Sequence, residues 1–359
     1  MALIGEEDRL RHELGLLYSD VSLEIRRRNG DGRVRGRRSP VPLPDAVRRA
    51  RRTAPKLALT GLVELAAGLK RLTGRDVIDL GRMLEIAVFV QRQRELASRG
   101  TEAFIDDFGF DREWTESLLP IFRWLFHSYW RIDTTGIANV PGAGRALLVS
   151  NHAGVLPWDG AMIKTAILEL HPRPRHARAL VAQYFFGLPT LSWFLRRTGQ
   201  TVGHPDDSIR LLERDELVLV FPEGVKGTGK RWSERYRLQR FGRGGFVQVA
   251  IRTRSPIVPI SVVGSEELYP MLGNLEPLAK LTGAPFFPIT PFFPLLGPLG
   301  MVPLPSRWRI QFHEPIRTDE LDPEQADDQN LVMTISDQVR DTIQRGIYEN
   351  LKLRRGTFR

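Results

Sequence analysis

Residues 217–227 read LVLVFPEGVKG, and this stretch is the most decisive for the fold of the chain. Four consecutive large apolar residues followed by Phe221 predict a short strand buried on both faces. An acid, Glu223, two glycines and the cation Lys226 follow at once. The stretch therefore predicts a buried strand whose carboxyl end is followed by tight turns and charged side chains.

A second stretch, residues 145–160, reads RALLVSNHAGVLPWDG. Its first six residues predict another short buried strand. The proline near its end suits the first turn of a helix, and residues 158–170 have helical apolar spacing. His152 is thus expected at the carboxyl end of a strand and Asp159 in the first turn of the next helix. The residues between them must fold back if the two side chains are to meet.

Together the two stretches resemble the first and third motifs of the glycerophospholipid acyltransferase family, which includes the 1-acylglycerol-3-phosphate acyltransferases. That family carries a His-(x)n-Asp pair and a Phe-Pro-Glu-Gly block, and the spacing between His152 and Asp159 is longer here than in most members. Residues 255–260 (SPIVPI) resemble the fourth motif, and residues 241–246 (FGRGGF) resemble an element before it. The resemblance covers roughly residues 125–320.

The resemblance implies transfer of an acyl group from a thioester to an alcohol, and the residue types suit that reaction. A neutral histidine can take the hydroxyl proton near pH 7. A carboxylate on its other ring nitrogen holds the required tautomer. We therefore assign His152 as the general base and Asp159 as its orienter, with the acceptor hydroxyl as the nucleophile. The alternative is a structural histidine beside a helix-capping aspartate.

The third motif supplies candidate substrate-binding residues. By resemblance, Glu223 and Gly224 contact the acceptor. Lys226 stands where many relatives have arginine, and a lysine can meet phosphate as a point charge. Lys230 adds positive charge nearby. A turn carboxylate and solvated lysines are the alternative interpretation.

The second motif departs from the family. Val202 occupies the position where the family usually has a phosphate-binding arginine. Arg196 or Arg197 is the candidate replacement, and the alternative is that both are ordinary cations at a helix end. The resemblance favours 1-acylglycerol-3-phosphate as the acceptor. Because Val202 weakens that choice, a neutral lipid alcohol such as diacylglycerol stays open as the alternative.

Several other chemistries find little support in the sequence. The chain has no cysteine, which excludes disulfides and thiol catalysis, and it has no Gly-x-Ser-x-Gly elbow. Residues 224–230 match the phosphate-loop pattern, but Arg231 replaces the magnesium-binding Ser or Thr. We expect no metal and no cofactor, only acyl-CoA or acyl-carrier protein as a co-substrate.

The net charge of +10 favours an anionic partner. The arginines of residues 26–38 and 48–52 raise the alternative of a nucleic-acid-binding protein, but no known nucleic-acid motif accompanies them. The partners that we expect are an anionic membrane surface, the thioester donor, the lipid acceptor and acyl-carrier protein, rather than nucleic acid.

Membrane contact at the surface is also expected. Residues 281–306 carry no charge and include seven prolines, which forbid a continuous helix. Their phenylalanines and leucines would form an interfacial segment, a lid over the acyl chain or an irregular buried connection. No apolar run is long enough to span a bilayer. We therefore expect a cytoplasmic protein, peripheral on the inner face of the membrane.

Strands and helices alternate along the chain, which indicates an α/β fold with a mixed sheet flanked by helices. Residues 1–110 are expected to form a basic helical extension with a Gly/Pro-rich linker, residues 111–325 the acyltransferase domain, and residues 326–359 a C-terminal helix and tail. The candidate strands are 147–150, 179–182, 217–221, 257–263 and 308–312.

Overall fold

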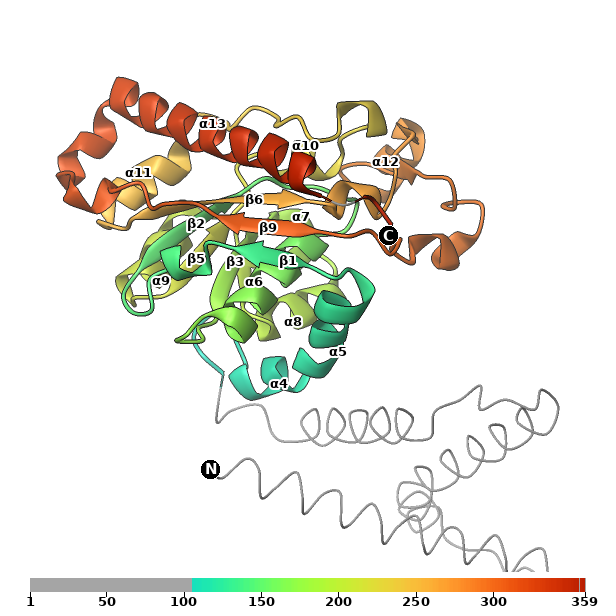
Figure 1. Ribbon diagram of the computed structural model, residues 1–359, viewed down its shortest axis with the longest axis horizontal. Helices are drawn as coiled ribbons and strands as arrows, with labels where there is room; N and C mark the ends of the chain where they lie inside the picture. Colours follow the sequence, from blue (N-terminus) through green and yellow to red (C-terminus); the bar gives the residue numbers. More distant parts are fainter. Residues whose placement is uncertain (1–104, 355, 359) are drawn as a thin grey trace, which may run out of the picture. The chain divides into compact units, whose positions relative to one another are not determined.

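A computed structural model describes residues 105–354 and 356–358 of the chain (Figure 1). These residues belong to one compact unit that begins at Gly100 and continues to the C-terminus. The N-terminal extension predicted for residues 1–110, with its basic linker and helices, lies almost wholly outside the described residues. The C-terminal helix, predicted as a separate segment, is part of the same unit as the sheet.

A seven-stranded mixed sheet forms the centre of the unit, in the order β1-β9-β6-β2-β5-β3-β4. The five strands from β6 to β4 are mutually parallel, whereas β9 runs antiparallel to β6. Parallel strands bring their carboxyl ends to one edge, which is called the carboxyl edge below. The strands are β1 (Asp133–Thr135), β2 (Ala146–Ser150), β3 (Ala177–Val181), β4 (Gln200–Val202), β5 (Leu217–Val220), β6 (Ile257–Val263) and β9 (Arg309–Phe312).

This arrangement confirms the predicted α/β class and mixed sheet. All residues of β2, β5 and β6 are buried, as expected for central strands covered on both faces. The short strands β1 and β4 were not predicted, because three residues are too few to show an apolar pattern. They occupy the two outer positions of the sheet.

The helices of the described residues connect the strands and cover the sheet (Figure 1). Two short helices precede the first strand and are followed by a π-helical turn, and Pro120 lies in the first turn of the second helix. The helices are α4 (Arg112–Ser117), α5 (Leu119–Trp124), α6 (Trp158–Leu170), α7 (Gln183–Phe186), α8 (Pro189–Arg197), α9 (Pro205–Glu213), α10 (Val225–Thr228), α11 (Gly245–Arg252), α12 (Glu276–Thr282) and α13 (Gln329–Leu353).

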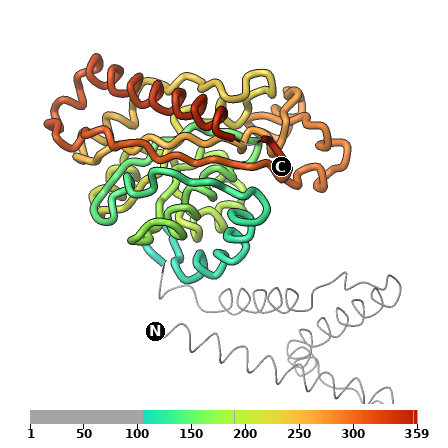
Figure 2. Tube along the Cα trace, in the orientation of Figure 1, coloured from blue at the N-terminus to red at the C-terminus, as the bar shows by residue number. Residues whose placement is uncertain are grey.

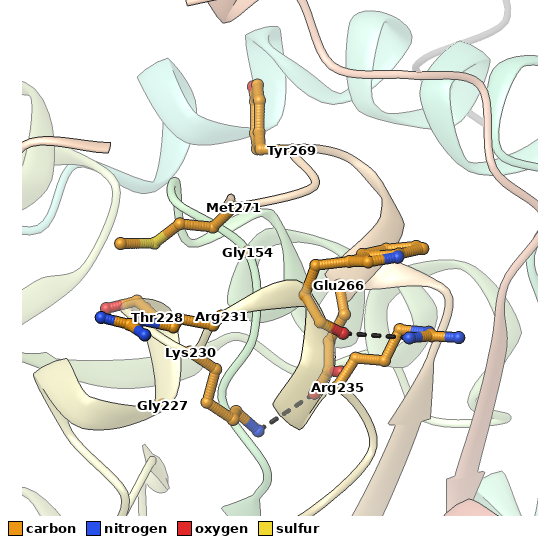
Figure 3. Close-up of a pocket in the computed structure, with 10 residues that line it drawn as sticks. Gly154, Gly227, Thr228, Lys230, Arg231, Arg235, Glu266, Tyr269 and Met271 are labelled. Atoms are coloured by element: carbon orange, nitrogen blue, oxygen red, sulfur yellow. Dashed lines mark hydrogen bonds and ion pairs between the residues drawn. The ribbon is translucent and has the colours of Figure 1, made fainter. Parts of the chain in front are cut away.

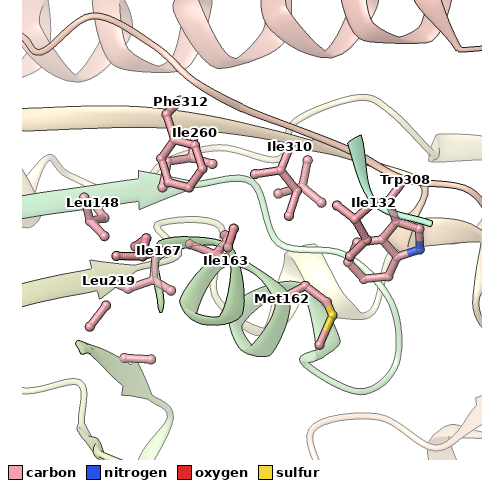
Figure 4. Packing of buried hydrophobic residues seen from close by; sticks show 14 of the residues in the cluster. Ile132, Leu148, Met162, Ile163, Ile167, Leu219, Ile260, Trp308, Ile310 and Phe312 are labelled. Carbon is pink, nitrogen blue, oxygen red and sulfur yellow. The ribbon is translucent and has the colours of Figure 1, made fainter. Parts of the chain in front are cut away.

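The core lies in two layers, one on each face of the sheet. Leu148 of β2 points to the layer that contains Ile163 and Ile167 of α6 (Figure 4). Its neighbours Leu147 and Val149 point to the other layer, which α9, α11 and α13 cover. Successive side chains of a strand alternate between faces. The continuous apolar run of β2 therefore serves both layers at once.

A long excursion, residues 264–308, connects β6 to β9 although the two strands are neighbours. Val263 at the end of β6 pairs directly with Arg309 at the start of β9. The excursion contains α12 and a two-stranded sheet of β7 (Gly273–Asn274) and β8 (Pro288–Ile289). In Figure 2 it forms the orange loops beyond the end of the main sheet. It therefore lies at the carboxyl edge, where β2 and β5 also end.

Candidate active site

The predicted histidine and aspartate meet at the carboxyl edge. His152 follows β2, the loop after it folds back, and Nδ1 of His152 lies 2.8 Å from Oδ2 of Asp159 in the first turn of α6. The Asp159 carboxylate is fully buried and also accepts hydrogen bonds from the main-chain N–H groups of Ala153 and Gly160, at 2.9 and 2.8 Å. The aspartate thus fixes both the imidazole and the loop that carries it.

The imidazole of His152 is held on a second side by an aromatic ring. Phe221, directly after β5, stacks on it with the ring centroids 4.2 Å apart and an interplanar angle of 23°. The histidine side chain remains 13% exposed, whereas that of Asp159 has no exposure. The imidazole therefore has one nitrogen bound to a buried carboxylate and a small opening to the outside.

Glu223 holds the main chain of the loop that carries His152. Its Oε1 accepts the main-chain N–H of His152 at 2.9 Å, and its Oε2 accepts the main-chain N–H of Gln239 at 2.6 Å. The ammonium of Lys230 lies 3.2 Å from the same Oε2, and the Glu223 side chain is completely buried. Both oxygens of this carboxylate thus contact the protein itself, and the acceptor contact that the family resemblance implies stays a prediction.

Two glycines allow the third motif to pass close to the histidine. Gly224 has φ +56° and ψ −146°, a conformation that only glycine adopts readily. A Cβ atom at Gly227 would lie 2.8 Å from the carbonyl oxygen and 2.9 Å from the Cβ of His152. Gly224 therefore allows the turn, and Gly227 leaves space for the loop that carries His152.

Lys230 is buried between two carboxylates. Its ammonium lies 3.0 Å from Oε1 of Glu266 and 3.2 Å from Oε2 of Glu223. Burial alone would lower the pKa of Lys230, but the charges of Glu266 and Glu223 hold it above its ordinary value. Burial raises the pKa of Glu266, against the opposing charge of Lys230. The positive charge of Lys230 is therefore balanced within the protein, by the carboxylates of Glu223 and Glu266.

The remaining predicted site residues lie apart from this cluster. Arg197, at the end of α8, is buried and its guanidinium lies 3.5 Å from Asp111. Because it precedes β4, it lies at the edge of the sheet opposite to His152. Arg197 therefore does not adjoin His152, and its predicted contact with a phosphate stays a prediction.

Val202 ends β4 at the carboxyl edge, but β5 and β3 stand between β4 and the catalytic strand β2. At about 4.8 Å per strand, this is a lateral separation of roughly 14 Å. Lys226, in the short helix α10, is exposed and has no hydrogen bond or ion pair to any described residue. Of the predicted cations, Lys226 is thus the one available to a ligand.

A small cavity adjoins the catalytic loop (Figure 3). Gly154 and Gly227 form its wall on the side of His152, and Arg231 and Arg235 contribute cationic side chains. The guanidinium of Arg235 lies 4.4 Å from the ring centroid of Trp232, in a cation–π contact. The other lining residues are Thr228, Lys230, Glu266, Tyr269 and Met271.

Sequence reasoning missed three residues that hold the site together. The side-chain amide of Asn151 bonds both the N–H and the carbonyl of Val262, at 2.8 and 2.9 Å, and so ties the end of β2 to β6. Phe221 stacks on the imidazole of His152, and Glu266 forms an ion pair with Lys230. The asparagine directly before the histidine could have predicted the first of these contacts. No sequence pattern indicated that Glu266 is the partner of Lys230. Among the described residues, no group of histidines and acids could hold a metal ion.

The chain is similar in sequence to known proteins. The sequence family described as Acyltransferase matches residues 131–263, which include both motifs. An uncharacterised protein of Mycobacterium tuberculosis is 43% identical over 346 residues, covering 95% of this chain and 96% of that protein. An uncharacterised protein of Mycobacterium leprae is 51% identical over 255 residues, covering 71% of this chain and 70% of that protein.

Two further proteins are more distant. A Gallus gallus protein named DGAT1/2-independent enzyme synthesizing storage lipids is 28% identical over 195 residues, 54% of either chain. The crystal structure of the 1-acyl-sn-glycerophosphate acyltransferase PlsC from Thermotoga maritima matches with a TM-score of 0.43 and 18% identity, covering 76% of this chain and 90% of that chain.

Proposed function

Because the chain belongs to the glycerophospholipid acyltransferase family, we propose that it transfers a fatty acyl group from a thioester to the hydroxyl of a glycerolipid. The observation that carries this proposal is the hydrogen bond between His152 and the buried carboxylate of Asp159. An ionised carboxylate only accepts hydrogen bonds, so Nδ1 donates and Nε2 keeps its lone pair. That lone pair is the base for the acceptor hydroxyl.

The proposed reaction needs no covalent enzyme intermediate. As Nε2 of His152 takes the hydroxyl proton, the acceptor oxygen attacks the thioester carbonyl. The new C–O bond forms, the C–S bond breaks, and the imidazolium returns its proton to the leaving thiolate. Asp159 stabilises the imidazolium in between. The donor is acyl-CoA or acyl-carrier protein, and no further cofactor enters the reaction.

For the acceptor we propose 1-acylglycerol-3-phosphate. The exposed Lys226, together with Arg231 and Arg235 at the cavity beside the catalytic loop, supports an anionic group near the histidine. A neutral acceptor such as diacylglycerol is the second candidate. Two observations favour it: Val202 removes the usual arginine, and a relative is named as an enzyme synthesizing storage lipids.

We also propose that the protein works on an anionic membrane, at its cytoplasmic face, where its lipid substrates reside. No described helix is both long enough and apolar enough to cross a bilayer. The net charge of +10 supports attraction to anionic lipid.

The test is an acyl-transfer assay with the purified full chain. Labelled acyl-CoA and acyl-carrier protein are each incubated with 1-acylglycerol-3-phosphate, diacylglycerol and monoacylglycerol, and the lipid products are separated. Labelled phosphatidic acid supports the first candidate, and labelled triacylglycerol the second. A folded protein that shifts DNA in a salt-dependent manner but acylates no lipid would overturn the assignment.

A further inference from the structure

The excursion between β6 and β9 exposes an unusual number of large apolar side chains. Leu295 is 84% exposed, Leu281 81% and Leu299 74%. Contiguous exposed apolar surface on a soluble domain usually marks an interaction site. The whole set, called the apolar loop surface below, is Leu272, Leu278, Leu281, Phe292, Leu295, Leu296, Leu299 and Val302.

Main-chain contacts gather this surface into one lobe. Leu272 donates its N–H to Ile289 at 2.8 Å, and Leu296 donates to Phe292 at 2.8 Å. A Cβ at Gly300 would lie 2.4 Å from the carbonyl oxygen of Phe292, so the two turns are packed closely. The exposed leucines therefore belong to a folded lobe.

Cations border the apolar loop surface. No charged residue occurs between 281 and 306, whereas Lys280 precedes this run and is exposed. The N–H of Trp232 donates to Met271 at 2.8 Å, which places the turn with Arg231 and Arg235 beside Leu272. Apolar side chains rimmed by arginine, lysine and tryptophan match the boundary between acyl chains and anionic headgroups.

The lobe is fastened to the catalytic residues. Tyr269 donates its hydroxyl to the carbonyl of Met301 at 2.9 Å, and it accepts the indole N–H of Trp158 at 3.1 Å. Trp158 directly precedes Asp159 in α6. Tyr129 makes a second attachment, to the carbonyl of Pro303 at 2.6 Å. The apolar loop surface and the His152–Asp159 pair thus share one rigid frame.

We propose that the apolar loop surface docks the protein on an anionic lipid bilayer. Its leucines enter the boundary between headgroups and acyl chains, while Arg231, Arg235 and Lys280 meet lipid phosphates. Since residues 264–308 leave and rejoin the sheet at the carboxyl edge, docking turns the edge that carries His152 toward the lipid. This deepens the proposed function, because it names the surface through which a membrane-resident acceptor reaches the site.

The test measures binding of the full chain to phosphatidylglycerol/phosphatidylcholine vesicles by co-sedimentation. Leu295→Glu and Leu299→Glu are the test variants. Both leucines are exposed, so neither change opens a core cavity. Withdrawing one leucine from the lipid should weaken binding about tenfold, and the double variant should lose about a hundredfold. Leu170→Glu is the matched control, at the far end of α6 from Asp159 and 40% exposed; it should bind like the wild type.

Separate measurements distinguish docking from catalysis. Activity on acceptor dispersed in detergent should stay near wild type in the double variant, whereas activity on vesicles should fall with binding. Vesicles of phosphatidylcholine alone, or added salt, should weaken binding of the wild type. Equal vesicle binding by the double variant and the wild type would overturn the proposal. So would a switch from dimer to monomer, or loss of carrier-protein binding, without any change in vesicle binding. Failure of acyl transfer in every assay would count against the proposed function and leave the docking result standing.

Discussion

The main-chain N–H of His152 donates to Oε1 of Glu223 at 2.9 Å, and this bond joins two motifs 71 residues apart in the chain. Through its second oxygen, Glu223 accepts the main-chain N–H of Gln239 and pairs with Lys230. The position of His152, the proposed base, thus depends on a buried carboxylate whose two oxygens both contact the protein. The following predictions separate groups that act on substrate from groups that hold this arrangement.

His152→Ala should reduce acyl transfer by about a hundredfold or more, the usual scale for loss of a general base. Folding should be nearly unchanged, because Asp159 keeps the two N–H donors of Ala153 and Gly160. Steady-state kinetics and thermal unfolding measure the two effects. His127→Ala, at a histidine whose side chain is 54% exposed, is the control and should retain activity. Turnover near wild type in a folded His152→Ala protein would rule out the mechanism.

Asp159→Asn should lower kcat strongly with little change in KM. The amide keeps the shape of the carboxylate but favours the wrong imidazole tautomer and gives no charge stabilisation to the imidazolium. The measurement is kcat and KM for both substrates, alongside the melting temperature. A variant that melts earlier yet keeps its kcat would show that Asp159 only caps α6.

The sequence was sufficient for the central fold and for the contact between His152 and Asp159, because both depend on local patterns; the catalytic role of the pair stays a prediction. The strands β2, β5 and β6 are unbroken apolar runs, and His152 and Asp159 stand at the boundaries of predicted elements. Because the loop between them folds back, Nδ1 of His152 lies 2.8 Å from Oδ2 of Asp159. The role of Lys230 could not be predicted in this way, since its partner Glu266 lies 36 residues further along the chain, in the turn Ser265–Glu267 that follows β6.

Arg197 illustrates the same limit. Its place in the sequence, shortly before the second-motif position, suggested a phosphate contact. The parallel pairing of β4 with β3 shows that Arg197, which precedes β4, lies at the edge opposite to the carboxyl edge. The short strand β4 was not predicted, so its direction and the pairing of Arg197 with Asp111 could not be read from the sequence.

Lys230→Met should destabilise the protein by about 3–5 kcal/mol, because it leaves two carboxylates buried without their partner. The pKa of Lys230 is raised, so its stabilising contribution is present at neutral pH and is lost as pH rises through that pKa. Urea unfolding at pH 7 measures the loss. Lys230→Met combined with Glu266→Gln should recover part of it. Unchanged stability with an increased acceptor KM would instead assign Lys230 to the substrate.

Lys226→Ala should raise the apparent KM for 1-acylglycerol-3-phosphate severalfold, since Lys226 is exposed and unpaired among the described residues. Added salt should weaken acceptor binding in the wild type more than in the variant, because the contact is electrostatic. Stability should stay unchanged. If diacylglycerol outcompetes 1-acylglycerol-3-phosphate in a mixed assay, the acceptor is neutral, and the variant should leave its KM as it was.

Lys164 predicts a pH dependence of stability. It is buried in α6 with its ammonium 2.5 Å from the carbonyl of Thr198, and burial, together with the nearby charge of Arg178, lowers its pKa to about 7. Between pH 7 and 10 the unfolded chain therefore binds more protons at this residue than the folded chain, so stability should rise with pH. In Lys164→Met this rise should be smaller. Parallel curves for the two proteins from pH 7 to 9 would contradict the lowered pKa.

Both carboxylate oxygens of Glu223 contact groups of the protein, and this has a consequence for how the acceptor of such a protein can change. If the substrate itself held the histidine in position, every change of substrate would also require new residues to hold the histidine. Here His152, Asp159 and the loop between them are held by contacts within the protein, through main-chain N–H groups and the Glu223–Lys230 pair. The cations that face outward, such as Lys226 and Arg231, take no part in that frame. Under the proposed mechanism, exchange of these surface residues would change which alcohol receives the acyl group and would leave the proton-transferring residues in place.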